Sequence, residues 1–342
     1  MRVSFFTFCV LPFLAGVSCA GDEFGDQFDE AVLREIAVGS CHRTGPKSEE
    51  AFACVVRAKP DAFLFLGDNI YGDTRDMKVL QEKYAALDAV TSWKQLRQST
   101  RVLGTWDDHD YGENDAGVEY PAKVESAKVQ KDFFAIPADH PMRKREGVYQ
   151  SAIFGPQGKR TQILLLDTRY FRSPLRQEKI DGRKAYLPDP DPAKTFLGEA
   201  QWKWLDTQLA QPADVRIIGS SIQILPEEHR FEKWANFPLE REKLLNKLAA
   251  AKGRLVLLSG DRHFAEISRQ TVGETQLVEM TTSGMTHTGG GKIGETNRHR
   301  VGEPVSSLNW GVVSIEWKEN AAPGLKLEVR NTEGKVTASH SW

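Results

Sequence analysis

Short apolar runs recur along this chain, and helical patterns stand between most of them. The runs lie at Glu35–Val38, Ala62–Leu66, Gln162–Leu166, Val215–Ile218 and Leu255–Leu258. Runs of this length and composition are typical of strands that are buried on both faces. Apolar residues with helical spacing occupy Ser48–Lys59, Glu199–Leu209 and Leu239–Lys252. The alternation predicts an α/β fold in which helices cover sheets.

The pattern changes after residue 270, where strand-like runs follow one another. Gly311–Trp317 and Leu325–Val329 are predicted strands, and Asn331–Gly334 is a predicted turn before a last strand that ends at Trp342. We expect these strands to form an antiparallel edge of the same domain. The charged, proline-containing segment Arg172–Lys194 is predicted to be a loop or lid.

The N-terminus has the composition of a signal peptide. Arg2 is followed by the almost wholly apolar residues 4–17 and by the small residues Ser18–Ala20. This pattern predicts a signal peptide over residues 1–20, cleaved after Ala20 or, alternatively, lipid-anchored at Cys19, with a single domain over 21–342. The apolar stretch is short for a transmembrane helix, so no transmembrane segment is expected in the mature chain. We expect a periplasmic or secreted protein; a buried N-terminal helix is the alternative.

Charge and cysteine content narrow the function classes. The formal net charge is -2, and no long run of one sign occurs, so the sequence predicts no nucleic-acid-binding patch and no attraction to anionic membranes. Of the four cysteines, Cys9 and Cys19 lie in the predicted signal peptide, which leaves Cys41 and Cys54. In an oxidising compartment these two could form a disulfide, and this remains an alternative to a metal-binding role for Cys41.

Residue types that commonly serve as metal ligands follow the predicted strands. They lie in the segments Gly39–His42, Gly67–Tyr71, Thr105–Asp110, Asp167–Arg169 and Ser259–His263. The carboxyl ends of neighbouring strands in an α/β sheet share one crevice, so these side chains can converge. Carboxylates, imidazoles, a phenol and a thiol in one crevice would be destabilised unless cations neutralised them. A site with more than one metal ion would bind a phosphate and activate water, which predicts metal-assisted hydrolysis.

Four motifs carry a family resemblance that extends over roughly residues 35–320. Gly67–Tyr71, Trp106–Asp110, Leu197–Leu205 and Ser259–His263 resemble motifs of the PhoD-like alkaline phosphatases, within the metallophosphoesterase superfamily. The resemblance implies a four-layer α/β/β/α sandwich with two mixed sheets. It also implies hydrolysis of phosphate esters at a centre of ferric iron and calcium; zinc, manganese or magnesium are alternative metals.

The resemblance also implies roles for individual residues. Asp68 resembles the carboxylate that bridges the cations, and Cys41 and Tyr71 resemble the ligands of ferric iron. Asp108 takes the place of an asparagine that binds the second cation in related motifs, and Asp107 is a weaker ligand candidate. Asp261 and His263 are the remaining two ligand candidates. His109 resembles the group that stabilises phosphate or protonates the leaving oxygen.

Several residues keep more than one interpretation. Arg169 is a candidate catalytic residue that either contacts phosphate or forms a structural ion pair. Gln223 stands where related enzymes have a histidine ligand, so it can offer an amide oxygen at best. Glu279 is expected to be a partly buried structural carboxylate. The histidines that remain as candidates for the surroundings of the site or the surface are His42, His229 and His287.

Taken together, the sequence predicts an exported, alkaline phosphatase-like phosphomonoesterase, acting as a monomer on a small phosphate ester or a phospholipid. The alternative within the same chemistry is a phosphodiesterase or phospholipase D-type enzyme, which depends on whether the segment Arg172–Lys194 leaves room for a second substituent on phosphorus. The alternative from another class is a non-catalytic metal-binding scaffold.

Overall fold

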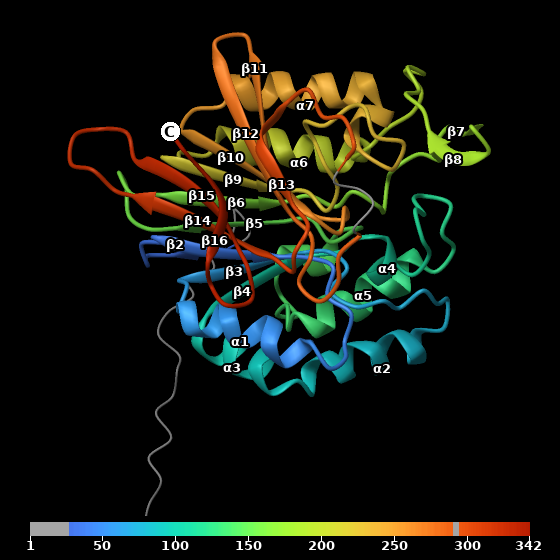
Figure 1. Cartoon of the computed structure of the whole chain (residues 1–342), viewed down its shortest axis with the longest axis horizontal. Coiled ribbons are helices and arrows are strands. Elements are labelled where there is room, and N and C mark those ends of the chain that lie inside the picture. The colour runs from blue at the N-terminus through green and yellow to red at the C-terminus, as the bar shows by residue number, and fades with distance from the viewer. Residues whose placement is uncertain (1–26, 290–293) are drawn as a thin grey trace, which may run out of the picture.

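The computed structural model describes residues 27–289 and 294–342 (Figure 1). The predicted signal peptide lies outside the described residues. Within the described ranges, no helix has both the length and the apolar character needed to cross a membrane.

Two mixed sheets form the centre of the molecule, and the larger has eight strands in the order β1-β5-β6-β9-β10-β12-β11-β13. Its middle strands β6, β9, β10 and β12 are parallel. The predicted strands at 162, 215 and 255 are β6, β9 and β10. The bounds are β1 (Phe28–Asp29), β5 (Gln150–Phe154), β6 (Thr161–Leu165), β9 (Val215–Gly219), β10 (Arg254–Ser259), β11 (Ala265–Val272), β12 (Thr275–Thr282) and β13 (Arg300–Val305).

The smaller sheet has six strands in the order β16-β15-β14-β2-β3-β4. Its strands β2, β3 and β4 are parallel, whereas β14 runs antiparallel to β2, with Gly311 opposite Val38. The predicted antiparallel edge is therefore confirmed for β14, β15 and β16. The bounds are β2 (Glu35–Gly39), β3 (Ala62–Leu66), β4 (Arg101–Thr105), β14 (Trp310–Glu316), β15 (Gly324–Arg330) and β16 (Val336–Ser341).

Helices lie on the outer side of each sheet (Figure 1). The smaller sheet is accompanied by α1, α2 and α3, and the larger by α6 and α7, so the prediction of two mixed sheets covered by helices is confirmed. The remaining helices, α4 and α5, lie near the carboxyl end of β4. The bounds are α1 (Ser48–Ala58), α2 (Met77–Asp88), α3 (Thr91–Ser99), α4 (Asp108–Tyr111), α5 (Lys123–Phe133), α6 (Gly198–Ala210) and α7 (Pro238–Ala250), with short 3-10 turns at Pro141–Lys144 and Trp234–Asn236.

Side-chain alternation along the strands builds the layers. On β3, Leu64 and Leu66 face the other sheet and pack in a shared core with Ile163 and Ile217, which we call the inter-sheet core. The alternate residue Phe63 faces outward and packs against helical side chains such as Phe52. On the far side, side chains of α6 and α7 cover the outer face of the larger sheet. The two sheets thus share one interior, with further apolar layers beneath the helices.

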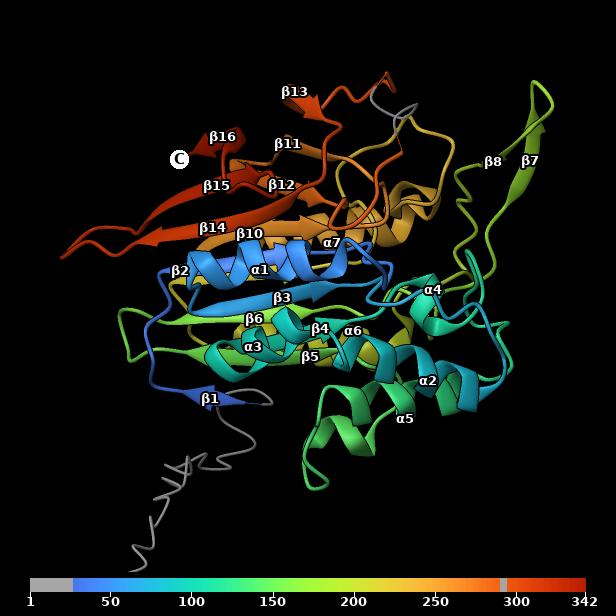
Figure 2. The same cartoon turned by 60° about the horizontal axis from the view of Figure 1, so that its bottom comes forward.

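The segment Arg172–Lys194, which was predicted to be a loop or lid, contains regular secondary structure. It contains a β-hairpin of β7 (Gln177–Ile180) and β8 (Arg183–Tyr186), which extends away from the two sheets (Figure 2). The connecting residues Asp181 and Gly182 have φ angles of 50° and 74°. Positive φ at both positions is the requirement of the tight turn that Asp-Gly favours between antiparallel strands. The Asp-Gly pair was the sequence signal for this hairpin.

Candidate metal centre

The loops that follow β2, β3 and β10 have an unusual backbone. Cys41, Asp68, Asp261 and His263 have φ angles of 57°, 49°, 66° and 58°, in the left-handed region that disfavours residues with a side chain. The first two loops also hold one another, because the Cys41 amide donates to the Gly67 carbonyl at 3.2 Å. Such conformations persist where surrounding structure enforces them, and they concentrate at functional sites. All four residues are sequence-predicted metal ligands.

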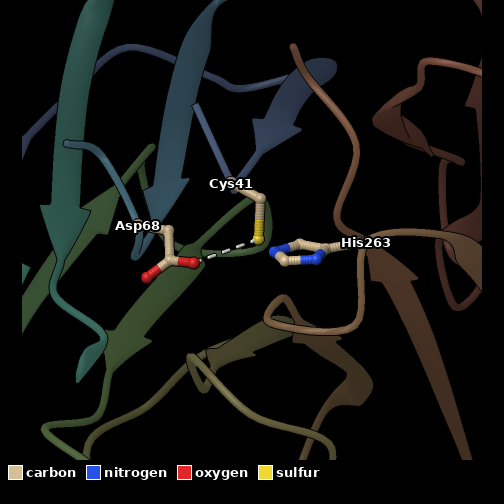
Figure 3. A group of neighbouring side chains, drawn as sticks. All are labelled: Cys41, Asp68 and His263. Atoms are coloured by element: carbon tan, nitrogen blue, oxygen red, sulfur yellow. Dashed lines mark hydrogen bonds between the residues drawn. The ribbon is translucent and has the colours of Figure 1, made fainter. Parts of the chain in front are cut away.

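Cys41, Asp68 and His263 form a first group of possible ligands, with ligand atoms all within 4.8 Å of one another (Figure 3). The Cys41 sulfur lies 3.5 Å from Asp68 Oδ2. The Tyr71 hydroxyl joins this group, because it donates to Asp68 Oδ2 at 3.0 Å and lies 3.1 Å from His263 Nε2. A sulfur, a phenol oxygen, a carboxylate and an imidazole therefore converge from the ends of three segments far apart in the sequence.

Asp68 also belongs to a second group, with Asp108 and His109, whose ligand atoms again lie within 4.8 Å of one another. Asp108 begins α4, and its carboxylate accepts the backbone N–H groups of His109 and Asp115, both at 2.8 Å. Burial raises the pKa of Asp108, but the nearby Arg169 and His109 and these hydrogen bonds lower it below its ordinary value. Asp68 is the one residue common to both groups, which is the position that a bridging carboxylate requires.

The electrostatics of the groups fit bound cations. Burial, reinforced by Asp108, raises the pKa of Asp68 well above its usual range. Burial and the charge of Asp68 likewise raise the pKa of Cys41 and of Tyr71. Within the described part of the chain, the buried oxygens Asp68 Oδ1 and Asp107 Oδ2 have no hydrogen-bond partner. Burying such atoms unpaired is unfavourable, and a cation would both neutralise the acids and occupy the open oxygens.

His109 is held by an aspartate that the sequence analysis did not single out. Its Nδ1 lies 2.6 Å from Asp73 Oδ1, and its ring lies 4.2 Å from the Tyr71 ring. Burial lowers the pKa of His109, but the bond to Asp73 and the charges of Asp108 and Asp68 raise it to about 10. Asp73 itself has a φ of 46°. The signal available in the sequence was the Gly-Asp pair that follows Tyr71.

Arg169 and Asp107 form a buried ion pair behind the metal groups. The Arg169 guanidinium is fully buried; its Nε donates to Asp107 Oδ1 at 2.7 Å, and its Nη1 donates to Glu232 at 2.6 Å. Of the two interpretations of Arg169, the geometry therefore favours a structural ion pair over phosphate contact. Asp167 is not its partner, because that carboxylate accepts the Trp106 indole N–H and backbone amides. Asp107 keeps one oxygen, Oδ2, free for a cation.

The other sequence candidates lie apart from the two groups. Gln223 donates its amide N–H to Glu266 at 2.7 Å and to Thr281 at 2.9 Å. Glu279 is fully buried and accepts the backbone N–H groups of Ile224 and Leu225, as a structural carboxylate does.

Two residues close to Cys41 have structural partners. His42 is buried between Ser48 and the Asn69 carbonyl, and its burial lowers its pKa to about 4. In the described residues, Cys41 and Cys54 are both free thiols, and Cys54 donates to the Ala51 carbonyl.

Three further residues contact the groups; His287 was expected near the site or on the surface, whereas the other two were not singled out in the sequence. His287 Nε2 lies 2.8 Å from the Tyr71 hydroxyl. Ser283 Oγ lies 3.0 Å from the Cys41 sulfur and accepts the His263 backbone N–H. The guanidinium of exposed Arg43 lies 4.5 Å from the centre of the Tyr71 ring. No motif marks these contacts, because each joins segments that only the folded chain brings together.

A cavity of about 410 Å³ adjoins the two groups, and we call it the side cavity. Asp261, which belongs to neither ligand group, lines it together with His263. The hairpin strand β8 and the segment before α7 form its other walls. The residues that line it are Asp108, His109, Asn114, Asp115, Lys184, Tyr186, Arg230, Phe231, Glu232, Asp261, Arg262 and His263.

Comparisons of sequence and structure relate this chain to known proteins. Comparison with curated protein sequences gives no significant match. A solved structure described as that of PhoD superposes with a TM-score of 0.67 at 17% identity, covering 90% of this chain and 72% of the other. A dimetal phosphatase from Danio rerio superposes with a TM-score of 0.52 at 14% identity, covering 91% of this chain and 98% of the other. These likenesses show the fold. The sequence profile of the PhoD-like phosphatases matches residues 36–338, and the chain therefore belongs to the PhoD-like phosphatase family.

Proposed function

We propose that this chain is an exported phosphomonoesterase whose two ligand groups hold ferric iron and calcium. Family membership already makes it a metal-dependent hydrolase of phosphoric esters. The observation that carries the finer proposal is the sharing of Asp68 between two groups of ligand atoms. The N-terminal composition of residues 1–20 supports export.

The two groups differ in donor chemistry, which supports two different metals. Cys41, Tyr71 and His263 offer sulfur, phenol oxygen and nitrogen beside Asp68, a set that suits iron. Asp68 and Asp108 offer carboxylate oxygens, which suit a hard cation such as calcium, and Asp107 Oδ2 is a further open oxygen. When bound, the cations would lower the pKa of a coordinated water and neutralise charge on the phosphate. Zinc, manganese or magnesium would change the metal content but not the reaction class.

Of the second ligand group, Asp68 and Asp108 are the proposed ligands, and His109 is instead the proposed proton donor to the leaving oxygen. With Nδ1 held by Asp73, Nε2 is the nitrogen left for the substrate; burial lowers the pKa of His109, but the hydrogen bond to Asp73 raises it and so favours the protonated imidazole. As water attacks phosphorus and the ester P–O bond breaks, the departing oxygen takes this proton. Exposed Arg43, stacked on Tyr71, supplies a positive charge for the phosphate, in place of the buried Arg169.

Phosphodiester hydrolysis, including a phospholipase D-type reaction, is the second candidate. The side cavity favours it, because about 410 Å³ beside Asp108 and His263 offers room for a second substituent on phosphorus. A non-catalytic metal-binding scaffold is the third candidate.

The test combines metal analysis with two substrates. Protein purified without residues 1–20 is subjected to elemental analysis and assayed with 4-nitrophenyl phosphate and bis(4-nitrophenyl) phosphate, with and without a chelator. Iron plus calcium, chelator-sensitive turnover and faster cleavage of the monoester are expected. Faster cleavage of the diester would establish the second candidate, and metal retained without turnover would establish the scaffold.

The assignment of Cys41 has its own test. Cys41→Ser should lose iron and any thiolate-to-metal absorption band, whereas Cys54→Ser, which removes a buried thiol bonded to the Ala51 carbonyl, should keep both. Equal iron content in the two variants would contradict a ligand role for Cys41.

A further inference from the structure

The side cavity joins the candidate metal centre to a wall of basic and aromatic side chains. Asp108 and His263, which belong to the ligand groups, line the cavity. Its lining also includes Lys184 and Tyr186 of β8 and Arg230. A substrate whose phosphate reaches the metal groups can place the rest of its alcohol moiety in this cavity, which is lined by residues of both ligand groups. The charges that line the cavity therefore bear on which alcohol moieties the enzyme accepts.

The acidic side chains of the cavity wall are already engaged. Both oxygens of Glu232 face arginines, with Arg169 Nη1 at 2.6 Å and Arg172 Nε at 2.9 Å. Asp115 accepts from Lys184 Nζ at 2.9 Å and from the Tyr186 hydroxyl at 2.6 Å. Asp108 belongs to the second ligand group, and Asp261 Oδ2 lies 3.9 Å from Arg262 Nη1. Among the described residues that line the cavity, Lys184 is thus neutralised by Asp115, and each acid faces a cation or belongs to a ligand group.

Two guanidinium groups retain hydrogen-bonding capacity. Arg230 is exposed and stacks on the Phe231 ring at 4.8 Å, and among the described residues its guanidinium has no acidic partner. Its carbonyl accepts the Tyr186 N–H at 2.8 Å, which ties its backbone to the hairpin. The backbone of Arg230 is therefore anchored to the hairpin, and its guanidinium lies over the Phe231 ring.

Arg262 is the second of these groups and is fully buried. Its Nη2 donates to Glu295, and its Nη1 lies 3.9 Å from Asp261 Oδ2. Its Nε and Nη1 have no hydrogen-bond acceptor within the described part of the chain. Its guanidinium lies 4.5 Å from the same Phe231 ring on which Arg230 stacks. Buried donors without acceptors are costly, and an anion at the cavity wall would satisfy them.

We propose that the side cavity recognises a second anionic group, a carboxylate or a phosphate, on the alcohol moiety of the substrate, through Arg230 and Arg262. This inference rests on the proposed phosphoesterase function and names its substrate class: phosphate esters whose alcohol carries a further negative charge. Guanidinium groups bind such anions through paired, charge-assisted hydrogen bonds, and both guanidinium groups lie close to the Phe231 ring, at 4.8 Å and 4.5 Å from its centre.

The test compares two substrates that differ by this one charge. The metal-loaded enzyme is assayed with 3-phosphoglycerate and with glycerol 1-phosphate, which carries a hydroxymethyl group in place of the carboxylate. The ratio of their kcat/KM values is expected to favour 3-phosphoglycerate by about tenfold or more, the effect of one charge-assisted hydrogen bond. In Arg230→Ala this ratio should fall by about tenfold. The ratio for Arg230→Lys should lie between those of the wild-type enzyme and Arg230→Ala.

Arg176→Ala is the matched control, because Arg176 is an exposed arginine at the base of the same hairpin, pairs with Glu178, and does not line the side cavity. It should leave the ratio unchanged. Equal ratios in the wild-type enzyme, Arg230→Ala and Arg176→Ala would overturn the anion site while the phosphoesterase assignment stands. Failure of the metal-loaded protein to cleave either substrate would instead refute the proposed function.

Discussion

The inter-sheet core and the candidate metal centre both contain fully buried residues but are physically opposite. Leu64 and Leu66 of β3 are fully buried among apolar side chains of the other sheet. Two residues beyond the end of the same strand, Asp68 is 1% exposed, has a left-handed backbone and keeps a buried oxygen without a partner in the described structure. Residues on β3 therefore stabilise the fold by apolar burial, whereas Asp68, just after the strand, destabilises the metal-free fold. The core specifies the fold, and the metal centre uses part of the stability that the core supplies.

The largest effect is expected from Asp68→Asn, which sharpens this comparison. Turnover should fall below detection, because the substitution removes the carboxylate shared by both ligand groups. The metal-free protein should at the same time become more stable at neutral pH, because burial opposes the charge of Asp68 and asparagine tolerates its left-handed backbone. Activity assays and denaturant unfolding of metal-free protein measure the two effects.

The control is Asp206→Asn, which removes an exposed carboxylate paired with Lys247 on the far side of α6. It should change neither property appreciably. An active Asp68→Asn enzyme would break the comparison, since Asp68 would then be an ordinary buried residue.

The second largest effect is expected from Leu64→Ala in the inter-sheet core, which should lower stability but leave activity unchanged. The cavity left by the truncated side chain should lower the free energy of unfolding by about 2–5 kcal/mol. Metal content and kcat at low temperature should stay close to wild type, because Leu64 lies on the core side of β3. Loss of metal from a folded Leu64→Ala protein would show that the two regions are coupled rather than separate.

A smaller effect is expected from Asp73→Asn, which leaves the metal groups intact but weakens the support of His109. Because Asp73 orients the imidazole and helps to keep it protonated, kcat should fall by about 10–100-fold with little change in KM. Elemental analysis should find unchanged metal content. An unchanged kcat, or a change confined to KM, would remove His109 from its proposed role as proton donor.

The smallest effect concerns Glu49, on the helical side of the smaller sheet. This exposed carboxylate accepts the backbone N–H groups of Thr91 and Ser92 at the start of α3, and these bonds lower its pKa to about 2. A lowered carboxyl pKa stabilises the fold above the ordinary pKa of glutamate, and the contribution is lost as the pH falls towards 2. The difference in unfolding free energy between wild type and Glu49→Gln should therefore shrink over this range. If the difference in unfolding free energy did not depend on pH, the charge of Glu49 would not contribute to capping α3.

The sequence predicted the strands of the inter-sheet core well, because continuous apolar runs such as Ala62–Leu66 have few alternative structures. It also placed Cys41, Asp68 and His263 at strand ends, and the fold brings their ligand atoms together. It did not identify Asp73 or Ser283, whose roles depend on partners distant in the chain. It left the partner of Arg169 open, since Glu232 lies in no recognisable motif. Local pattern determines elements, whereas long-range ion pairs and supporting contacts need the fold.

The pairing of β2 with β14 has a consequence for the order in which the molecule can be completed. Ile36 lies opposite Val313, so strands from the two ends of the chain are neighbours in the smaller sheet. Pairings over such sequence separation are slow to form, and this one cannot form before residues 310–316 have been synthesised. The loop that carries Cys41 leaves β2 and therefore lacks one flanking strand until β14 has paired with β2. Metal loading should accordingly follow the pairing of β14 with β2.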